Sequence, residues 1–147
     1  MKNIVFVCTG NTCRSPMAEG IFRVLAEKYG LADVTCSSCG TCAYTGLPAN
    51  PYAVSAAAAY GADISRHRSR ALTEYLLAEG DLFVCMTKPH AMQLQRFLPP
   101  EKVCVLGDGI ADPYGGDAEE YRECAAQIYA ALDAWIQTFQ TDKGEET

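Results

Sequence analysis

Short apolar segments alternate along this chain with longer segments of helical periodicity. Four apolar segments are continuous and rich in Val, Ile and Phe, as in strands that are buried on both faces of a parallel sheet. These segments are Ile4–Cys8, Val34–Ser38, Leu82–Met86 and Val103–Leu106. Because helical segments separate the strands, the pattern predicts a single α/β domain with a mostly parallel sheet.

Start and stop signals predict four helices. Each helix begins at a capping residue, and three of them end at glycine. The expected helices run from Ser15 to Gly30, from Asn50 to Gly61, from Thr73 to Gly80 and onward from Asp117. Asp117 forms a capping box with Glu120. In the last helix, apolar residues recur at three- and four-residue steps from Tyr121 to Phe139 and predict one buried stripe. The domain is expected to span residues 1–140, followed by a polar tail, Thr141–Thr147, that frays.

Composition and charge narrow the class of protein. The chain has 147 residues, of which 49% are hydrophobic and 20% charged, enough for one core and without an apolar run of membrane-spanning length. Met1-Lys2-Asn3 shows no signal-peptide pattern, which predicts a cytoplasmic protein, by default a monomer, whose eight cysteines are reduced. A net charge of −6 argues against nucleic acid as the main partner, so any bound anion must be held by local groups.

A tight polar turn, CTGNTCRS at residues 8–15, joins the first strand to the first helix. Its consecutive backbone N–H groups can curl around an anion, and the helix adds the positive end of its dipole. Gly10, and to a lesser degree Asn11, can adopt the left-handed conformation that such curling needs. The residues expected to surround a bound phosphate are Thr9, Gly10, Asn11, Thr12, Cys13 and Ser15.

The same turn carries a candidate nucleophile. Arg14 can close the ring of donors with a planar, bidentate fork suited to phosphate oxygens. The thiolate form of Cys8 is favoured near a helix amino end and a cation, and the Ser15 hydroxyl can donate to its sulfur. A phosphate-shaped pocket with a thiolate at its floor predicts nucleophilic phosphoryl transfer. The alternative is a glycine-containing turn around a buried structural cysteine.

The stretch VCTGNTCRSPMAEG resembles the phosphate-binding signature of the low-molecular-weight protein phosphatases. The resemblance covers nearly the whole chain and includes SCGT at residues 38–41, residues 64–70, Cys85-Met86 and Asp112-Pro113-Tyr114. It implies a four-stranded parallel sheet flanked by helices. It also implies a two-step reaction through a cysteinyl-phosphate that needs no cofactor. Phosphorylated proteins are then the expected partners, and phosphate or other oxyanions the expected inhibitors. The resemblance also implies that His67 contacts Asn11, although His67 can equally be an exposed residue among arginines.

Asp112 is the candidate proton donor. It lies in GIADPYGG, a loop with glycine on both sides that can bring a carboxyl group over the pocket. An Asp-Pro pair is by itself more typical of a simple turn. The resemblance implies that Asp112 protonates the leaving group and then deprotonates the attacking water. Asp108 is a nearby carboxylate, whereas Asp117 is better explained as a helix cap.

Thr12 is the position that bears on the substrate. Phosphotyrosine-specific members of the family usually carry a bulky aliphatic residue there, and threonine resembles the bacterial protein-arginine phosphatases. A hydroxyl suits a polar guanidinium group, whereas an apolar wall favours a phenyl ring. The Asp-Pro-Tyr-Gly-Gly loop and Met86-Thr87 favour the same assignment, but Tyr114 and Tyr44 can also stack on a phosphotyrosine ring. We therefore expect phosphoarginine, with phosphotyrosine as the alternative.

Two other activities are compatible with an anion-binding loop. A thiol-linked arsenate reductase needs further cysteines in the third-strand region, and Cys85 has no cysteine partner shortly after it. A phosphate sensor without turnover needs neither Cys8 nor Asp112. Both are weaker predictions than a phosphatase.

The remaining cysteines suggest redox chemistry more than metal binding. Cys13 follows Cys8 along the curled loop, so oxidation can join them in a reversible disulfide, although Cys13 can equally be a small packing residue. Cys36, Cys39 and Cys42 resemble a metal-binding run. However, Cys36 and Cys39 would point to opposite faces of a strand, so no metal site is expected.

Overall fold

Four parallel strands form one sheet at the centre of the protein. The computed structural model describes the backbone of residues 2–146 and the side chains of residues 2–139. The strands lie in the order β2-β1-β3-β4 and comprise β1 (Lys2–Cys8), β2 (Val34–Gly40), β3 (Leu82–Cys85) and β4 (Val103–Val105). All four predicted strands are confirmed, as is the four-stranded parallel sheet.

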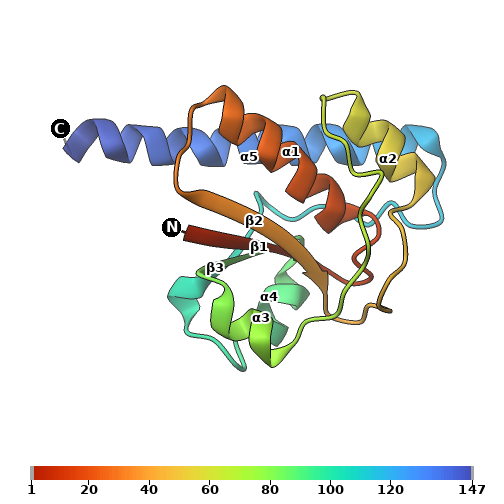
Figure 1. The fold of residues 1–147 in the computed structure, drawn as a ribbon, viewed down its shortest axis with the longest axis horizontal. Helices are drawn as coiled ribbons and strands as arrows, with labels where there is room; N and C mark the ends of the chain where they lie inside the picture. The colour runs from red at the N-terminus through yellow and green to blue at the C-terminus, as the bar shows by residue number, and fades with distance from the viewer. Residues whose placement is uncertain (1, 147) are drawn as a thin grey trace.

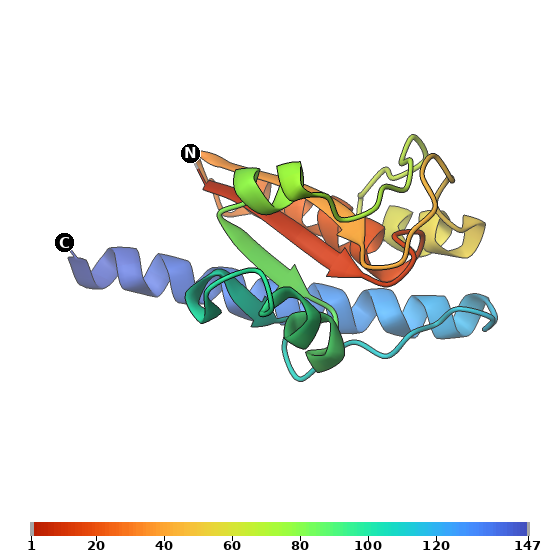
Figure 2. The ribbon, with the colours of Figure 1, turned by 90° about the horizontal axis from the view of Figure 1, so that it is seen from below.

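Helices cover both faces of the sheet (Figure 1). One face packs against α1 (Arg14–Lys28), α2 (Pro51–Ala58) and α5 (Ala118–Glu146), and the other against α3 (Glu74–Glu79) and α4 (Lys88–Leu94), an arrangement that Figure 2 shows from a second direction. Side chains alternate along β1: Ile4, Phe6 and Cys8 enter the first core, whereas Val5 and Val7 enter the second. This alternation follows from the two-residue period of a strand.

Three of the predicted helix caps are confirmed by side-chain hydrogen bonds. Asn50 accepts from the N–H of Tyr52, Thr73 accepts from Leu76, and Asp117 accepts from Glu120. Gly30 has a φ of +65° directly after α1, and Gly80 ends α3. Both glycines therefore stop their helices as predicted, whereas α2 ends at Ala58, before a turn that reaches Gly61.

The predicted start of α1 at Ser15 is wrong. The helix begins at Arg14, its N-cap is Cys13, and no side chain caps it. Ser15 instead uses its hydroxyl within the loop that precedes the helix. This first turn leaves its backbone N–H groups without a side-chain cap, which is the arrangement that an anion-binding helix terminus requires.

Two features of the helices lie beyond the sequence prediction. The helix α4 was not predicted, although Thr87 caps it by accepting the N–H of His90 and Pro89 lies in its first turn. The helix α5 continues through Glu146 into the segment where we expect fraying, and it runs along the length of the molecule (Figure 1). The domain boundary at residue 140 and the frayed tail 141–147 stay predictions, because the side chains there lie outside the described residues. No helix in the described chain combines the length and apolar character needed to cross a membrane.

Gly20 allows α1 to approach the segment that follows α2. A Cβ at this position would lie 2.6 Å from Ile64 Cγ2 and 3.2 Å from Ala62 Cβ. We therefore expect Gly20→Ala to lower the free energy of unfolding by about 1–3 kcal/mol through overpacking, even though alanine is the better helix former. Urea denaturation measures the change.

If overpacking causes the loss of stability in Gly20→Ala, removing a neighbouring side chain should reduce that loss. Combined with Ile64→Ala, the substitution should cost clearly less than it does alone. The exposed Glu27 of α1 provides the control, since Glu27→Ala should change stability little. A gain in stability for Gly20→Ala alone would contradict the close packing of this glycine.

Candidate active site

A cavity of about 220 Å³ lies where β1 ends and α1 begins. It brings Asp112, the predicted proton donor, next to the predicted nucleophile Cys8 and the predicted anion fork Arg14, which lie about a hundred residues earlier in the sequence. Its lining consists of Cys8, Thr9, Gly10, Thr12, Cys13, Arg14, Asp112 and Tyr114. The position is typical of a ligand site in an open α/β sheet, at the carboxyl ends of the strands.

Cys8 lies at the floor of this cavity with only 2% of its surface exposed. Its Sγ is 2.9 Å from Ser15 Oγ. Ser15 Oγ accepts a hydrogen bond from Asn11 Nδ2 at 2.8 Å, so its own proton can be donated to the sulfur, which is closer than its other acceptor, the carbonyl oxygen of Cys39 at 3.5 Å. A hydroxyl donor and the amino end of α1 both stabilise negative charge on Sγ, so the surroundings favour a nucleophilic thiolate.

Asn11 holds the loop in its curled shape. Its φ of 57° is left-handed, and its amide donates to Ser15 Oγ and to Ser38 Oγ while Oδ1 accepts the backbone N–H of Arg70. His67 Nε2 lies 2.7 Å from the carbonyl oxygen of Asn11 and donates to it, which confirms the expected contact. The side chain of Asn11 thus ties the loop to two other segments of the chain.

Of the two residues expected to be able to adopt the left-handed conformation, Asn11 does so, whereas Gly10, the favoured one, is absent from the positive-φ glycines of the described chain. Gly40 is the glycine that the loop depends on, because a Cβ there would lie 2.4 Å from the carbonyl oxygen of Thr9 and 3.1 Å from the backbone nitrogen of Asn11. The end of β2 therefore supports the loop from behind at a distance that only glycine allows.

Arg14 connects the loop to the segment that carries Asp112. The guanidinium is only 4% exposed; its Nη1 donates to the carbonyl oxygen of Ile110 at 3.0 Å, and its Nη2 lies 3.5 Å from Asp112 Oδ2. A buried cation beside the cavity provides the positive charge that an anion needs, in a protein whose net charge is −6.

Asp112 lines the cavity from the segment between β4 and α5. Its side chain is half exposed, and Oδ1 accepts the backbone N–H of Tyr114 at 3.0 Å, which fixes the carboxyl group in its own turn. Asp108 lies outside the cavity lining, and Asp117 caps α5. The geometry therefore selects Asp112 from the three nearby carboxylates as the group that can exchange a proton with a ligand.

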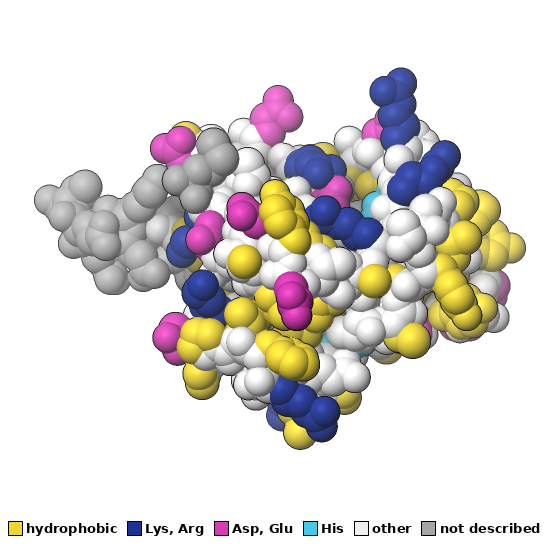
Figure 3. Space-filling view, turned by 60° about the horizontal axis from the view of Figure 1, so that its bottom comes forward, with side chains coloured by type: hydrophobic (Ala, Val, Ile, Leu, Met, Phe, Trp, Pro, Cys, Tyr) yellow, Lys and Arg dark blue, Asp and Glu magenta, His cyan; other side chains and the backbone are white. Residues whose placement is uncertain are grey.

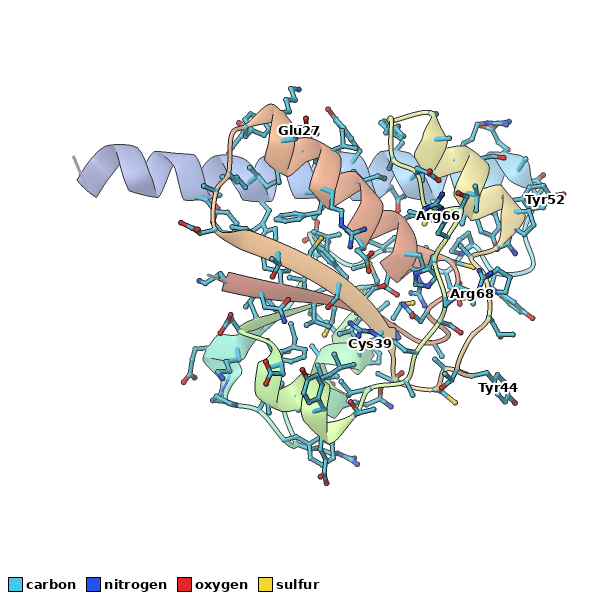
Figure 4. The ribbon with its side chains drawn as sticks, viewed as in Figure 1. Glu27, Cys39, Tyr44, Tyr52, Arg66 and Arg68 are labelled. Atoms are coloured by element: carbon cyan, nitrogen blue, oxygen red, sulfur yellow. The ribbon has the colours of Figure 1, made fainter. Side chains whose placement is uncertain are left out.

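The two candidate tyrosines differ in position. Tyr114 lines the cavity and is 77% exposed. Tyr44 is 80% exposed and points away from the body of the molecule, outside the cavity lining (Figure 4). A role of Tyr44 in substrate selection remains a prediction. Figure 3 shows basic and acidic side chains mixed over one face of the molecule. In the cavity itself, the cationic side chain of the lining is Arg14.

Cys13 lines the cavity but packs differently from Cys8. Its Sγ lies 3.2 Å from the hydroxyl of Tyr121, which is fully buried. Burial raises the pKa of Cys13, so this thiol is a poorer nucleophile than its position in the loop suggests. Both Cys8 and Cys13 are free thiols, and a regulatory disulfide between them stays a prediction.

The cysteines of the expected metal-like run lie apart. Cys36 packs against the core under α1, whereas Cys39 enters the core under α3 and α4, as a three-residue spacing on a strand predicts. Burial raises the pKa of each to about 12, and Cys42 is exposed. Within the described residues, no group of three or more His, Cys, Asp or Glu side chains could hold a metal ion.

His90 belongs to the surroundings of the site and was missed in the sequence. It is 5% exposed, its Nε2 lies 2.8 Å from Thr9 Oγ1, and its Nδ1 lies 2.8 Å from Thr87 Oγ1. Burial, and next the positive charge of Arg14, lower the pKa of His90, so the ring is neutral at pH 7. The sequence signal was the Thr-Lys-Pro-His stretch, which starts a helix directly after the third strand.

Known proteins resemble this chain in sequence and in fold. The family described as Low molecular weight phosphotyrosine protein phosphatase matches residues 3–145. The "Probable low molecular weight protein-tyrosine-phosphatase EpsP" of Ralstonia nicotianae is 36% identical over 92% of this chain and 94% of its own. The protein-arginine-phosphatase of Bacillus subtilis is also 36% identical, over 96% of this chain and 99% of its own.

A solved structure of similar fold carries a phosphorylated active site. It is a cysteine-to-serine mutant of the YwlE arginine phosphatase with a phosphorylated active-site serine, with a TM-score of 0.85, 35% identity and coverage of 95% of this chain and 97% of that one. Relatives therefore include both tyrosine and arginine phosphatases. From its sequence, its fold and the cavity around Cys8, the chain belongs to the low molecular weight phosphotyrosine protein phosphatase family and is a cysteine-dependent protein phosphatase.

Proposed function

We propose that this protein removes phosphate from phosphoarginine side chains of proteins. The observation that carries the proposal is Thr12, whose hydroxyl-bearing side chain lines the cavity. A guanidinium group has N–H donors on every nitrogen and is stabilised by oxygen acceptors around it, whereas a phenyl ring leaves such oxygens without a partner. The Bacillus subtilis protein-arginine-phosphatase and the YwlE arginine phosphatase, both similar to this chain, support the proposal.

The first chemical step transfers the phosphoryl group to Cys8. The thiolate attacks phosphorus, an S–P bond forms, and the P–N bond to the guanidinium breaks. Arg14 and the N–H groups of the loop stabilise the charge on the phosphoryl oxygens in the transition state. The proton of Asp112 goes to the departing nitrogen, so that arginine leaves as a stable cation.

The second step releases inorganic phosphate. Asp112, now a carboxylate, takes a proton from a water molecule, whose oxygen attacks phosphorus while the S–P bond breaks. The sulfur leaves as a thiolate, which Ser15 stabilises at 2.9 Å. Asp112 and Cys8 return to their starting states, and no cofactor is consumed. The phosphorylated serine of the YwlE mutant supports transfer to this position of the loop.

Hydrolysis of phosphotyrosine is the second candidate function. Tyr114 supports it, because its exposed ring at the cavity could stack on a phenyl group. A phosphoarginine peptide and a phosphotyrosine peptide of matched sequence, assayed side by side, test the proposal. A higher kcat/KM for the phosphoarginine peptide supports it, and a higher kcat/KM for the phosphotyrosine peptide would overturn it.

The role of Cys8 as nucleophile predicts the behaviour of Cys8→Ser. Turnover should fall at least about a thousandfold, because serine is a far weaker nucleophile than a thiolate. Binding of inorganic phosphate, measured by calorimetry, should persist because the N–H groups and Arg14 remain. The exposed Cys42 provides the control, and Cys42→Ser should retain full turnover. Full activity of Cys8→Ser would assign the nucleophile to another group.

The role of Asp112 as general acid predicts a dependence on the leaving group. Asp112→Ala should lower kcat by about 10²–10⁴-fold for a substrate with a poor leaving group, and far less for one with an activated aryl leaving group. The exposed Asp108 lies outside the cavity, so Asp108→Ala should leave both rates near the wild-type values. Equal losses of Asp112→Ala on the two substrates would rule out proton donation.

The role of Thr12 in substrate selection predicts the effect of Thr12→Ile. An aliphatic side chain removes the hydroxyl and provides an apolar wall, so the ratio of kcat/KM for phosphoarginine to that for phosphotyrosine should fall about tenfold or more. Thr12→Ser keeps the hydroxyl and serves as the matched control. An unchanged ratio in Thr12→Ile would remove the observation on which the choice of phosphoarginine depends.

A further inference from the structure

Thr9 and Thr12 both line the cavity, and their hydroxyl groups differ in how closely a partner holds them. Thr12 Oγ1 has a long contact of 3.8 Å with Cys13 Sγ. Thr9 Oγ1 lies 2.8 Å from Nε2 of His90, whose other ring nitrogen lies 2.8 Å from Thr87 Oγ1. A neutral, almost completely buried histidine therefore connects the start of α4 to the wall of the cavity.

We infer that Thr9 is a specificity-determining residue that accepts a hydrogen bond from the guanidinium group of the substrate, and that His90 is the positioning residue that holds its hydroxyl for this purpose. The inference rests on the proposed phosphoarginine activity. It assigns a role to the Thr9 side chain beyond the backbone contribution that the loop makes to phosphate binding.

The position of Thr9 fits contact with the leaving group. Cys8 and Arg14 are buried at the floor of the cavity, where the phosphoryl group must lie to meet the sulfur. Thr9 lines the same cavity but is an exposed residue. Its side chain is therefore located toward the mouth, beside the substrate atoms that lie beyond phosphorus.

The hydrogen-bond directions follow from what a guanidinium group offers. All of its polar hydrogens are donors, so Thr9 Oγ1 must accept from it and must send its own proton elsewhere. Nε2 of His90 is the acceptor in reach, at 2.8 Å. The ring proton then lies on Nδ1 and is donated to Thr87 Oγ1, which also accepts the backbone N–H of His90.

This arrangement requires a neutral ring. A protonated His90 would donate from Nε2 to Thr9 and turn the hydroxyl proton toward the cavity, where it would face the donors of the guanidinium. Burial of His90, together with the positive charge of Arg14, lowers its pKa and keeps the acceptor state at neutral pH. The nearby negative charge of Asp112 acts in the opposite direction and raises the pKa of His90, but less than burial and Arg14 lower it.

The same hydroxyl discriminates against an aryl phosphate. A phenyl ring offers no N–H group, so the oxygen of Thr9 would lose water without gaining a partner. Thr9 and Thr12 then both contribute a hydroxyl-bearing side chain to the cavity lining. The inference thus adds Thr9, whose hydroxyl is held by His90, to Thr12 as a residue that selects the substrate.

The test compares Thr9→Val with Thr9→Ser on matched phosphoarginine and phosphotyrosine peptides. Valine keeps the shape of threonine without the hydroxyl, so the ratio of kcat/KM for phosphoarginine to that for phosphotyrosine should fall about tenfold or more. Serine should keep most of the wild-type ratio. Inhibition by inorganic phosphate, which has no guanidinium group, should weaken less in Thr9→Val than turnover of phosphoarginine does.

The role of His90 is tested through rescue. His90→Leu should lower the same ratio, His90→Gln should restore most of it by offering an amide to Thr9, and adding His90→Leu to Thr9→Val should lower it no further. The chain has two histidines, and the other one, His67, provides the control. Because His67 supports the loop through the carbonyl oxygen of Asn11, His67→Leu should lower kcat/KM for both substrates by a similar factor.

The outcomes separate the inference from the proposed function. If the wild type fails to hydrolyse phosphoarginine, the proposed function is wrong and this inference falls with it. Suppose that the wild type does hydrolyse phosphoarginine, but that Thr9→Val weakens kcat/KM for both substrates and inhibition by phosphate equally. The hydroxyl then acts on the phosphoryl group, and the inference alone is overturned. A ratio that stays constant in His90→Leu while it falls in Thr9→Val would remove His90 as the positioning residue.

Discussion

The structure depends on one constraint: backbone N–H groups that point at an anion cannot also bond to their own loop. A segment that keeps these groups free must be held in shape from outside. Asn11 meets this need, because its side chain makes three hydrogen bonds, to Ser15, Ser38 and the backbone of Arg70, from a left-handed backbone conformation. His67 and the close approach of Gly40 complete the support, so the cavity exists before a ligand arrives.

The same constraint explains how distant parts of the chain act together. Arg14 leaves the loop at the start of α1 and bonds to the carbonyl oxygen of Ile110, two residues before Asp112. A buried cation is stable only with partners, and here the partners belong to the segment that carries the proton donor. In the proposed mechanism, the cation that binds the phosphoryl group therefore also sets the position of the acid, and both steps use the same geometry.

Much of the fold and site could be predicted from the sequence because local signals agree with one another. The strands, the caps at Asn50, Thr73 and Asp117, and the loop after β1 depend on residues close together in the chain. The sequence could not show that Asn11, not Gly10, takes the left-handed conformation, because the deciding partners, Ser38 and the backbone of Arg70, are distant in sequence. His90 was missed for the same reason: a helix of seven residues is too short to give a clear periodic signal, and the contact of His90 with Thr9 spans 81 residues.

Burial alone does not make a cysteine reactive, and this protein illustrates the difference among its own thiols. Cys39, Cys85 and Cys124 lie in apolar surroundings that raise the pKa of each to about 12, so they stay protonated and inert. Cys8 is as buried, but its sulfur has the Ser15 hydroxyl and the uncapped first turn of α1 beside it. In the proposed mechanism the missing cap has a function: a side chain that satisfied those N–H groups would occupy the place proposed for the phosphate and would remove a donor set that the other buried thiols lack.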